Sequence, residues 1–226
     1  MDTTRSTESC MARFFARHYD GLTAATERHW LAAHRAALVG PLRGRVLEIG
    51  AGTGANLPYY RDLRCLTVVE PSPAMRDRLR NRLDTAAVPV DLVDATAERL
   101  PFPAGAFDAV VCTLVLCSVD DPAQAVAEIR RVLAPWGRLV FLEHVRDSGL
   151  RGRIQHLVTP VHRRLAAGCH PDRDTVAALR AGGFELTSLE VFRPPAVGVA
   201  RPVAEGTAVL PHGQYLRELH WLSGGS

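Results

Sequence analysis

VLEIGAGTGANL, residues 46–57, joins a short apolar run to a loop with glycines at positions 50, 52 and 54. The run at 45–50 is typical of a short buried strand. The glycines remove Cβ atoms where the chain turns sharply and where backbone approaches a ligand. Because open α/β sheets bind ligands at the carboxyl ends of their strands, the stretch predicts an α/β fold with a ligand site at this loop.

Strands alternate with helices on the C-terminal side of this stretch. After 45–50 we expect strands at 66–70, 90–95, 107–116 and 137–145, with helices at 73–83 and 122–133. This alternation is typical of a doubly wound parallel sheet. Two more strands are expected at 184–193 and 203–210, the second paired as a hairpin. We therefore predict an α/β fold: a doubly wound, mostly parallel, seven-stranded Rossmann-like sheet with an antiparallel last strand.

The composition indicates one folded domain over residues 1–226, because 47% of the residues are apolar and 23% are charged. A net charge of +3 is too small to indicate a nucleic-acid partner, and no apolar run is long enough for an integral membrane segment. The first 20 residues lack the apolar core of a signal peptide. The five cysteines show no C-x-x-C spacing, so we expect no disulfide framework, no metal, and a reducing, cytoplasmic setting.

For three further segments the sequence supports only a coarse structural prediction. Residues 12–39 have helical spacing, and 153–168 carry an apolar stripe typical of an amphipathic helix that Pro160 kinks or splits. The region 146–164 is basic, which predicts a solvated helix face, with an acidic substrate or a membrane surface as the alternative. The tail QYLRELHWL, residues 214–222, fits a homodimer contact or a packed terminal helix.

The glycine loop alone leaves two nucleotide cofactors open. Gly50, Gly52 and Ala55 satisfy the dinucleotide pattern G-x-G-x-x-G/A, and Glu70 follows 20 residues after Gly50 as a ribose-binding acid. A nicotinamide dinucleotide and S-adenosylmethionine both contain an adenosine that such an acid could bind. Glu48 favours the second, because a carboxylate inside the first strand suits a ligand that carries an ammonium and a sulfonium.

Four segments resemble the class I S-adenosylmethionine-dependent methyltransferases over roughly residues 40–145: VLEIGAGTGANL, VVEPSPAM, AERLPFPAGAFDAVV and EIRRVLAPWGRLVFLEH. The resemblance implies that Glu48 orients the amino group of S-adenosylmethionine and that Glu70 accepts its ribose hydroxyls. The segment 71–75 and the pair 96–97 would lie along the adenine, with Asp94 as the alternative to Thr96 for the hydrogen bond to the adenine amino group. The implied cofactor contacts are Glu48, Gly50, Ala51, Gly52, Gly54, Glu70, Pro71, Met75, Thr96, Ala97, Cys112 and Thr113.

A closer resemblance links the chain to the methyltransferase-like thiol (alkyl) S-methyltransferases. VVCTLVLCSV at 110–119, GTGANL, EHV and AAGCHPDRDT at 166–175 carry it. We expect N-terminal lid helices at 1–40, a cofactor-binding core at 41–145, and an acceptor-covering segment with the last strands at 146–226. The residues themselves favour a small-molecule acceptor, because Leu114, Leu116 and Cys117 at the end of the fourth strand would form an apolar wall.

The candidate catalytic residues lie at the end of the fifth strand and in the first helix. Glu143 and His144 point to opposite faces of a strand, so only one is expected to reach the pocket. We choose His144 as the base, because its ordinary pKa suits the task; a histidine that only caps the strand is the alternative. Tyr19 and Asp20 are interpreted as lid residues, or else as helix-end packing. Cysteines 112, 117 and 169 are interpreted as small apolar lining, with a metalloid-binding or redox group of thiols as the alternative.

The sequence thus favours S-adenosylmethionine-dependent methyl transfer to a small thiol. Alternatives are an O-, N- or C-methyltransferase of a secondary metabolite, quinone or lipid, and a non-catalytic protein that binds the cofactor. A nicotinamide oxidoreductase is disfavoured, because a chain without lysine cannot contain a Tyr-x-x-x-Lys pair.

Overall fold

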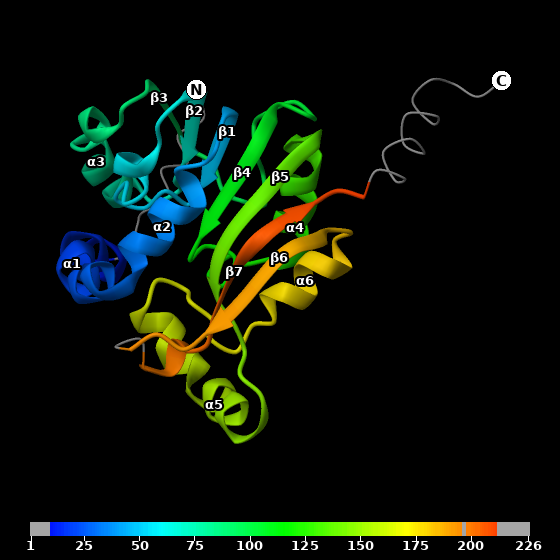
Figure 1. The fold of residues 1–226 in the computed structure, drawn as a ribbon. Helices are drawn as coiled ribbons and strands as arrows, with labels where there is room; N and C mark the ends of the chain where they lie inside the picture. The colour runs from blue at the N-terminus through cyan, green and yellow to red at the C-terminus, as the bar shows by residue number, and fades with distance from the viewer. Residues whose placement is uncertain (1–9, 196–197, 212–226) are drawn as a thin grey trace, which may run out of the picture.

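The computed structural model describes residues 10–195 and 198–211, which form one seven-stranded sheet with helices on both faces (Figure 1). The strand order is β3-β2-β1-β4-β5-β7-β6. The strands are β1 Gly44–Ile49, β2 Leu63–Val69, β3 Val90–Val93, β4 Phe107–Thr113, β5 Leu133–His144, β6 Glu185–Phe192 and β7 Val203–Val209. Strands β1 to β5 pair in parallel, whereas β7 is antiparallel to both β5 and β6. The predicted fold class is confirmed.

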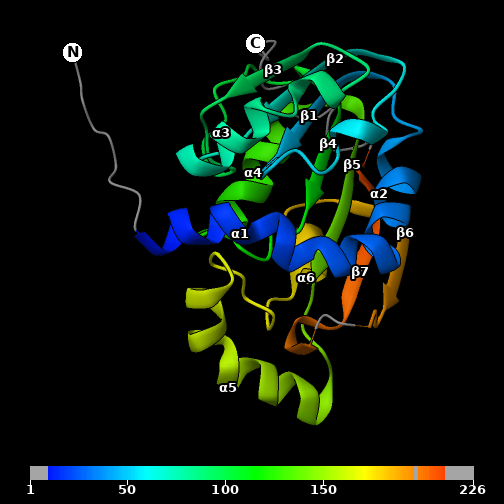
Figure 2. The same cartoon turned by 90° about the vertical axis from the view of Figure 1, so that its left-hand side faces the viewer.

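Helices cover the sheet in two layers (Figure 2). The helices are α1 Cys10–Thr26, α2 Ala32–Val39, α3 Pro73–Arg80, α4 Pro122–Val132, α5 Gly149–Leu165 and α6 Thr175–Ala181, with a π-helical turn at Glu27–Leu31 between α1 and α2. Successive residues of β1 point to opposite faces of the sheet and so pack against different helix layers. Leu47 and Ile49 pack toward α4 and α6, while Val46 packs with the side chains of α2 and α3. The two buried apolar clusters therefore fix β1, and with it the glycine loop, between the layers.

Several predicted boundaries change in the structure, among them the start of β5, which lies at Leu133 rather than at 137. The strand expected at 107–116 ends at Thr113, because Leu114 takes a φ of +60° and the chain turns there. The helix expected at 73–83 ends at Arg80, and a 3-10 turn follows at Leu83–Thr85. The early end of β4 matters for the site, because residues 114–117 then form a turn at the carboxyl edge of the sheet.

Helix α5 is a single helix, and Pro160 lies within it rather than splitting it. Gln155 anchors it: its side-chain amide donates to the carbonyls of Val145, Val199 and Arg201, and its oxygen accepts from the N–H of Asp147. The apolar stripe faces outward, with 47–78% of each side chain exposed at Leu150, Ile154, Leu157, Val161 and Leu165. The predicted amphipathic helix is therefore present, but a polar contact holds it to the fold.

Among residues 10–195 and 198–211, no helix has both the length and the apolar character needed to cross a membrane. The tail proposed as a dimer contact lies outside the described residues.

Candidate cofactor and acceptor site

The glycine loop lies where three parallel strands end. Ile49 of β1 is paired with Val69 of β2 and with Cys112 of β4, so the segments that follow these strands meet at one edge of the sheet. Gly52 has a φ of +58°, and no described atom lies within 4 Å of the Cβ that a larger residue would place there. This open backbone surface is the kind that lets a ligand approach the loop closely.

Glu70 lies beside this open surface. Its carboxylate accepts hydrogen bonds from the backbone N–H groups of Gly52 and Ser72, each with an N···O distance of 2.8 Å. Only 6% of the residue is exposed. An ionised carboxylate only accepts hydrogen bonds, so the group is chemically suited to bind ligand hydroxyls. The structure thus brings Glu70 and the glycine loop together, as the sequence predicted.

The predicted adenine contacts follow β2 and β3. Ser72 caps α3 by accepting from the N–H of Met75, which is buried, while Pro71 is exposed. Thr96 is exposed and bridges to Arg99, and Ala97 is buried in the core. Asp94, offered as a substitute partner for the adenine, pairs with Arg76 at 2.7 Å.

Glu48 is buried in a polar network behind the loop. Asn56 Nδ2 and Tyr60 Oη each donate to its carboxylate at 2.9 Å. Burial raises the pKa of Glu48 to about 7, against the effect of these two hydrogen bonds and of the Arg35 charge. Asn56 also donates to Thr113 Oγ1 at 3.2 Å and accepts from Arg35 Nη1 at 2.9 Å. The network joins the loop to the end of β4.

Arg35, Asn56 and Tyr60 were not singled out in the sequence. They could have been found from the rule that a buried carboxylate needs hydrogen-bond donors. Asn56 and Tyr60 follow Glu48 by eight and twelve residues and are its donors in the structure. Of the other predicted contacts, Ala51 is buried in the cluster next to α2 and α3, and Cys112 is fully buried in the opposite cluster.

Helix α1 is tied to the glycine loop through Asp20. Its carboxylate accepts from Thr53 Oγ1 at 2.7 Å and pairs with Arg78 at 2.7 Å and Arg82 at 2.8 Å. These charge-assisted hydrogen bonds lower the pKa of Asp20 although burial opposes them. Tyr19 is half-buried beside it, and burial raises its pKa. Figure 2 shows α1 crossing the view between the strand ends and α5.

Glu143 organises the turn after β4. This residue is fully buried, and its carboxylate accepts from the backbone N–H groups of Val115 and Leu116 at 2.9 Å and of Cys117 at 3.1 Å. Burial raises the pKa of Glu143, and the three N–H groups counteract it. From the sequence alone, Glu143 is only the alternative to His144 at the end of the fifth strand. The structure shows that both meet the segment 114–117.

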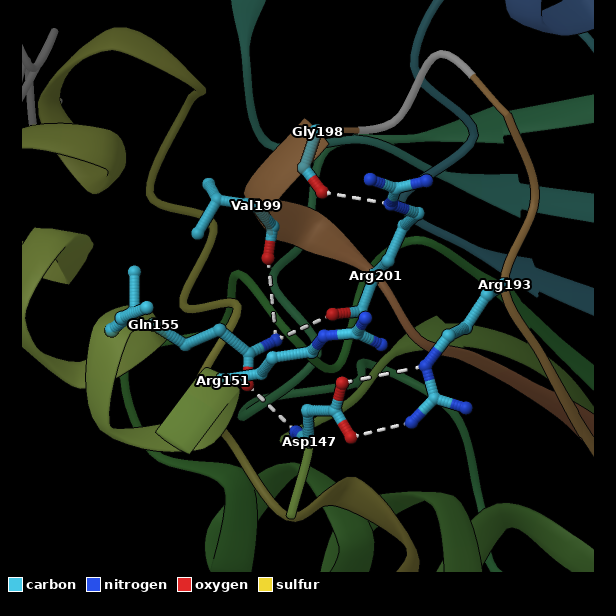
Figure 3. A pocket seen from close by; sticks show the side chains of 8 residues that line it. Asp147, Arg151, Gln155, Arg193, Gly198, Val199 and Arg201 are labelled. Atoms are coloured by element: carbon cyan, nitrogen blue, oxygen red, sulfur yellow. Dashed lines mark hydrogen bonds and ion pairs between the residues drawn. The ribbon is translucent and has the colours of Figure 1, made fainter. Parts of the chain in front are cut away.

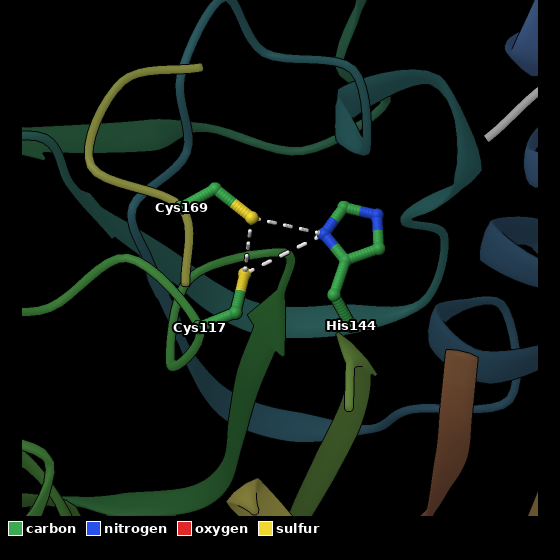
Figure 4. A group of neighbouring side chains, drawn as sticks. All are labelled: Cys117, His144 and Cys169. Carbon is green, nitrogen blue, oxygen red and sulfur yellow. Dashed lines mark hydrogen bonds between the residues drawn. The ribbon is translucent and has the colours of Figure 1, made fainter. Parts of the chain in front are cut away.

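His144 lies against two cysteines from separate loops (Figure 4). Its Nδ1 is 3.7 Å from Cys117 Sγ and 3.4 Å from Cys169 Sγ, and the two sulfurs are 3.8 Å apart. Both cysteines are buried, while His144 is half-buried. The hydrogen bond with Cys169, together with burial, raises the pKa of Cys117 well above its ordinary value. Cys112 lies apart in the core, so the three cysteines do not gather as one group.

A separate cavity of about 430 Å³ lies beside α5 (Figure 3). The described residues that line it are Asp147, Arg151, Ile154, Gln155, Arg193, Gly198, Val199 and Arg201, and none of them is a predicted site residue. Arg193 pairs with Asp147 at 2.6 Å. The cavity has a basic wall, but it does not include the glycine loop or His144.

Comparison with known proteins gives a consistent result. A family described as "Methyltransferase domain" matches residues 47–141, which contain the loop, Glu70 and Thr113. The thiol S-methyltransferase TMT1B of Rattus norvegicus is 34% identical over 155 residues, covering 66% of this chain and 64% of that protein. The thiol S-methyltransferase TMT1A of Homo sapiens is 32% identical over 170 residues, covering 73% and 70%.

Relatives with other named substrates also match. A phosphatidylethanolamine N-methyltransferase of Cereibacter sphaeroides is 32% identical over 155 residues, covering 67% of this chain and 73% of that protein. A solved structure from Thermotoga maritima, a SAM-dependent methyltransferase described as a possible histamine N-methyltransferase, has a TM-score of 0.66 at 24% identity and covers 89% of this chain and 98% of its own. That similarity shows that this chain and the Thermotoga maritima protein share a fold.

The chain spans about 64% of the length of the rat relative. It covers more than two thirds of the human TMT1A protein at over 30% identity. The chain belongs to the S-adenosylmethionine-dependent methyltransferases.

Proposed function

We propose that this protein transfers the methyl group of S-adenosylmethionine to the sulfur of a small thiol. The observation that carries the proposal is the position of His144, with the sulfurs of Cys117 and Cys169, at the edge of the sheet where the glycine loop also lies. The similarity to two thiol S-methyltransferases supports sulfur as the acceptor atom.

The residues present fit the cofactor. We assign its ribose to Glu70 and its methionine part to the open backbone at Gly52, with Gly50, Ala51 and Gly54 shaping that loop. Glu48 has both carboxylate oxygens engaged by Asn56 and Tyr60, so it would reach the amino group through its remaining acceptor positions or through water. When bound, S-adenosylmethionine supplies a methyl group already activated by the sulfonium charge.

The chain itself has two tasks, alignment and activation of the acceptor. Methyl transfer needs the acceptor sulfur about 3–3.5 Å from the methyl carbon and in line with it. The thiol would give up its proton to His144 or to solvent, and its sulfur would bond to that carbon. The bond between the methyl carbon and the sulfonium sulfur would break, and its electron pair would stay on the departing sulfur. The products are a thioether and S-adenosylhomocysteine. We assign His144 as the residue that activates the thiol and Tyr19 as a lid residue over the site.

The turn at residues 114–117 would form the acceptor wall. Leu116 and Cys117 are buried there, and Leu114 is partly exposed. Helix α5 and the loop that follows it, within residues 146–170, are our candidate for the cover that selects the acceptor. This assignment is supported by Cys169, which brings the end of that segment to His144.

A panel of acceptors tests the function. The purified protein is incubated with S-adenosylmethionine and, separately, an aryl thiol, an alkyl thiol, sulfide, a phenol and a catechol, with products identified by mass spectrometry. Methylated thiols with no methylated phenol are expected. His144→Ala should lower kcat/KM for the thiols by about 100-fold, the lower end for loss of an acid–base group, because a thiol needs little help to ionise. Turnover of phenols alone would overturn the sulfur assignment.

An alternative function, methylation of a lipid amine, has two observations in its favour. The phosphatidylethanolamine N-methyltransferase relative covers as much of this chain as the rat thiol relative does, and α5 presents an apolar face flanked by exposed arginines. An amine on a lipid is therefore the second acceptor to try. Methylation of phosphatidylethanolamine in mixed micelles, with no thiol product, would favour this alternative.

A further inference from the structure

The cluster of Cys117, His144 and Cys169 has the spacing of a coordination shell. A tetrahedral Zn²⁺ with Zn–S of about 2.3 Å and Zn–N of about 2.0–2.1 Å places its sulfur ligands about 3.8 Å apart and sulfur and nitrogen about 3.6 Å apart. The structure has 3.8 Å between the sulfurs, and 3.7 and 3.4 Å from the sulfurs to Nδ1. The three ligand atoms therefore form one face of such a tetrahedron.

The backbone around the cluster is fixed by contacts that do not depend on the sulfurs. The N–H of His170 donates to the carbonyl of Cys117 at 2.8 Å, which joins the loop after α5 to the turn after β4. Arg173 Nη1 donates to the carbonyls of Leu116 and Val119, each at 2.8 Å. Glu143 holds the N–H of Cys117 from the other side. Such outer contacts are what orient ligands in protein metal sites.

The donor set selects the class of cation. Two thiolates and an imidazole suit soft or borderline metals such as Zn²⁺, whereas Mg²⁺ and Ca²⁺ require oxygen ligands. A disulfide between Cys117 and Cys169 would explain why the two sulfurs lie close together. It would not explain why His144 Nδ1 lies close to both sulfurs. Three protein ligands with one vacant vertex are the arrangement of catalytic rather than structural zinc sites.

We propose that Cys117, His144 and Cys169 bind one Zn²⁺-like thiophilic cation and leave its fourth coordination position open. This revises the expectation drawn from the cysteine spacing, because the ligands come from three segments and form no local motif. Both cysteines are buried and His144 is half-buried, so the accessible side of the cluster is the side of His144.

The cation gives His144 a specific role, which rests on the function proposed above. An acceptor thiol that takes the open position would lose its proton to solvent, since a thiol bound to such a cation is deprotonated outright. His144 would then be a positioning residue that acts through the cation. The methyl acceptor is a metal-held thiolate, and no oxidant or reductant is needed.

Metal titration tests the site without reference to catalysis. The full chain is reduced, freed of metal with a chelator, and titrated with Co²⁺ under argon. We expect one equivalent to bind with a thiolate-to-cobalt charge-transfer band in the near ultraviolet, and one equivalent of Zn²⁺ to abolish that band. Cys117→Ser, Cys169→Ser and His144→Gln should each weaken binding by at least about 100-fold, the upper end of the loss caused by changing an outer-shell partner.

Cys65→Ser is the matched control, because Cys65 is an exposed cysteine on β2. It should bind Co²⁺ as the wild type does. Calorimetric binding of S-adenosylmethionine shows that each variant is folded. The proposal is overturned if the reduced wild type shows no thiolate band or if Cys117→Ser keeps it. It is also overturned if thiol titration of the purified protein before reduction finds a Cys117–Cys169 disulfide in place of bound metal.

The outcomes for the site and for the function are separable. Stoichiometric binding that depends on these three residues supports the metal site even when no thiol is methylated, a result that would overturn only the proposed function. Thiol methylation at an unchanged rate in the metal-free protein would overturn the role of the cation in activating the acceptor.

Discussion

The carboxylate of Glu143 accepts a hydrogen bond from the backbone N–H of Cys117, with 3.1 Å between Oε2 and N. The next residue along β5, His144, approaches the sulfur of the same cysteine at 3.7 Å. The end of β5 thus positions Cys117 through both its backbone and its side chain. Because Glu143 also holds Val115 and Leu116, one buried carboxylate determines the shape of the turn at the acceptor side.

Glu143→Gln tests this arrangement. The glutamine amide has one oxygen, which can accept from only some of the three backbone N–H groups. Its NH₂ group would face the remaining N–H donors, and neither group could accept a hydrogen bond from the other. We expect the free energy of unfolding to fall by about 1–3 kcal/mol, the cost of leaving a buried polar group unsatisfied. Urea unfolding measures it. Glu185→Gln, at an exposed position of β6, is the control and should change stability by less than about 0.5 kcal/mol. Equal losses in both variants would contradict the role of Glu143.

Gly52→Ala separates backbone strain from loss of the cofactor surface. Gly52 and Gly105 have φ values of +58° and +69°, and no described atom lies within 4 Å of an added Cβ at either. Alanine should therefore cost about 1–2 kcal/mol of stability at both positions. Only Gly52→Ala should also weaken S-adenosylmethionine binding, by at least about tenfold, because the new methyl group occupies the open surface beside Glu70. Calorimetry that finds equal affinities for the two variants would rule out this surface as the cofactor site.

Glu48 should make stability depend on pH. Burial raises its folded-state pKa to about 7, above its unfolded value near 4.3, so the folded protein binds the extra proton between these values. The contribution of Glu48 is therefore most favourable below pH 4 and is lost as pH rises to 7. We expect the stability of the wild type relative to Glu48→Gln to fall by on the order of 3 kcal/mol between pH 4 and pH 8. If the difference in unfolding free energy between the wild type and Glu48→Gln stays the same from pH 4 to pH 8, then folding does not raise the pKa of Glu48.

Much of the fold was predictable because its signals are local. Apolar runs predicted all seven strands, and the spacing from the glycine loop to Glu70 predicted that the two meet at one edge of the sheet, since residue spacing within about 25 positions encodes both. The direction of the apolar stripe on α5 was not encoded in this way. Its spacing predicts an amphipathic helix but not which side packs, and Gln155 makes the anchoring contacts.

The acceptor side was predicted less completely, because its contacts join distant segments. Cys117 and Cys169 are 52 positions apart in the sequence, and no periodic pattern connects them to His144. Strand alternation correctly separates Glu143 from His144 along β5. It cannot show that the turn after β4 bends so that Cys117 meets both residues, a result that follows from the positive φ of Leu114.

A competition between two acceptors that differ only in the reacting atom distinguishes methyl transfer to sulfur from transfer to oxygen. Thiophenol and phenol are supplied together at equal concentration with methyl-labelled S-adenosylmethionine, and the labelled products are quantified by mass spectrometry. We expect labelled thioanisole in an amount equal to the S-adenosylhomocysteine formed, with no labelled anisole. Labelled anisole, or S-adenosylmethionine that binds at Glu70 without any thioanisole being formed, would contradict methyl transfer to sulfur.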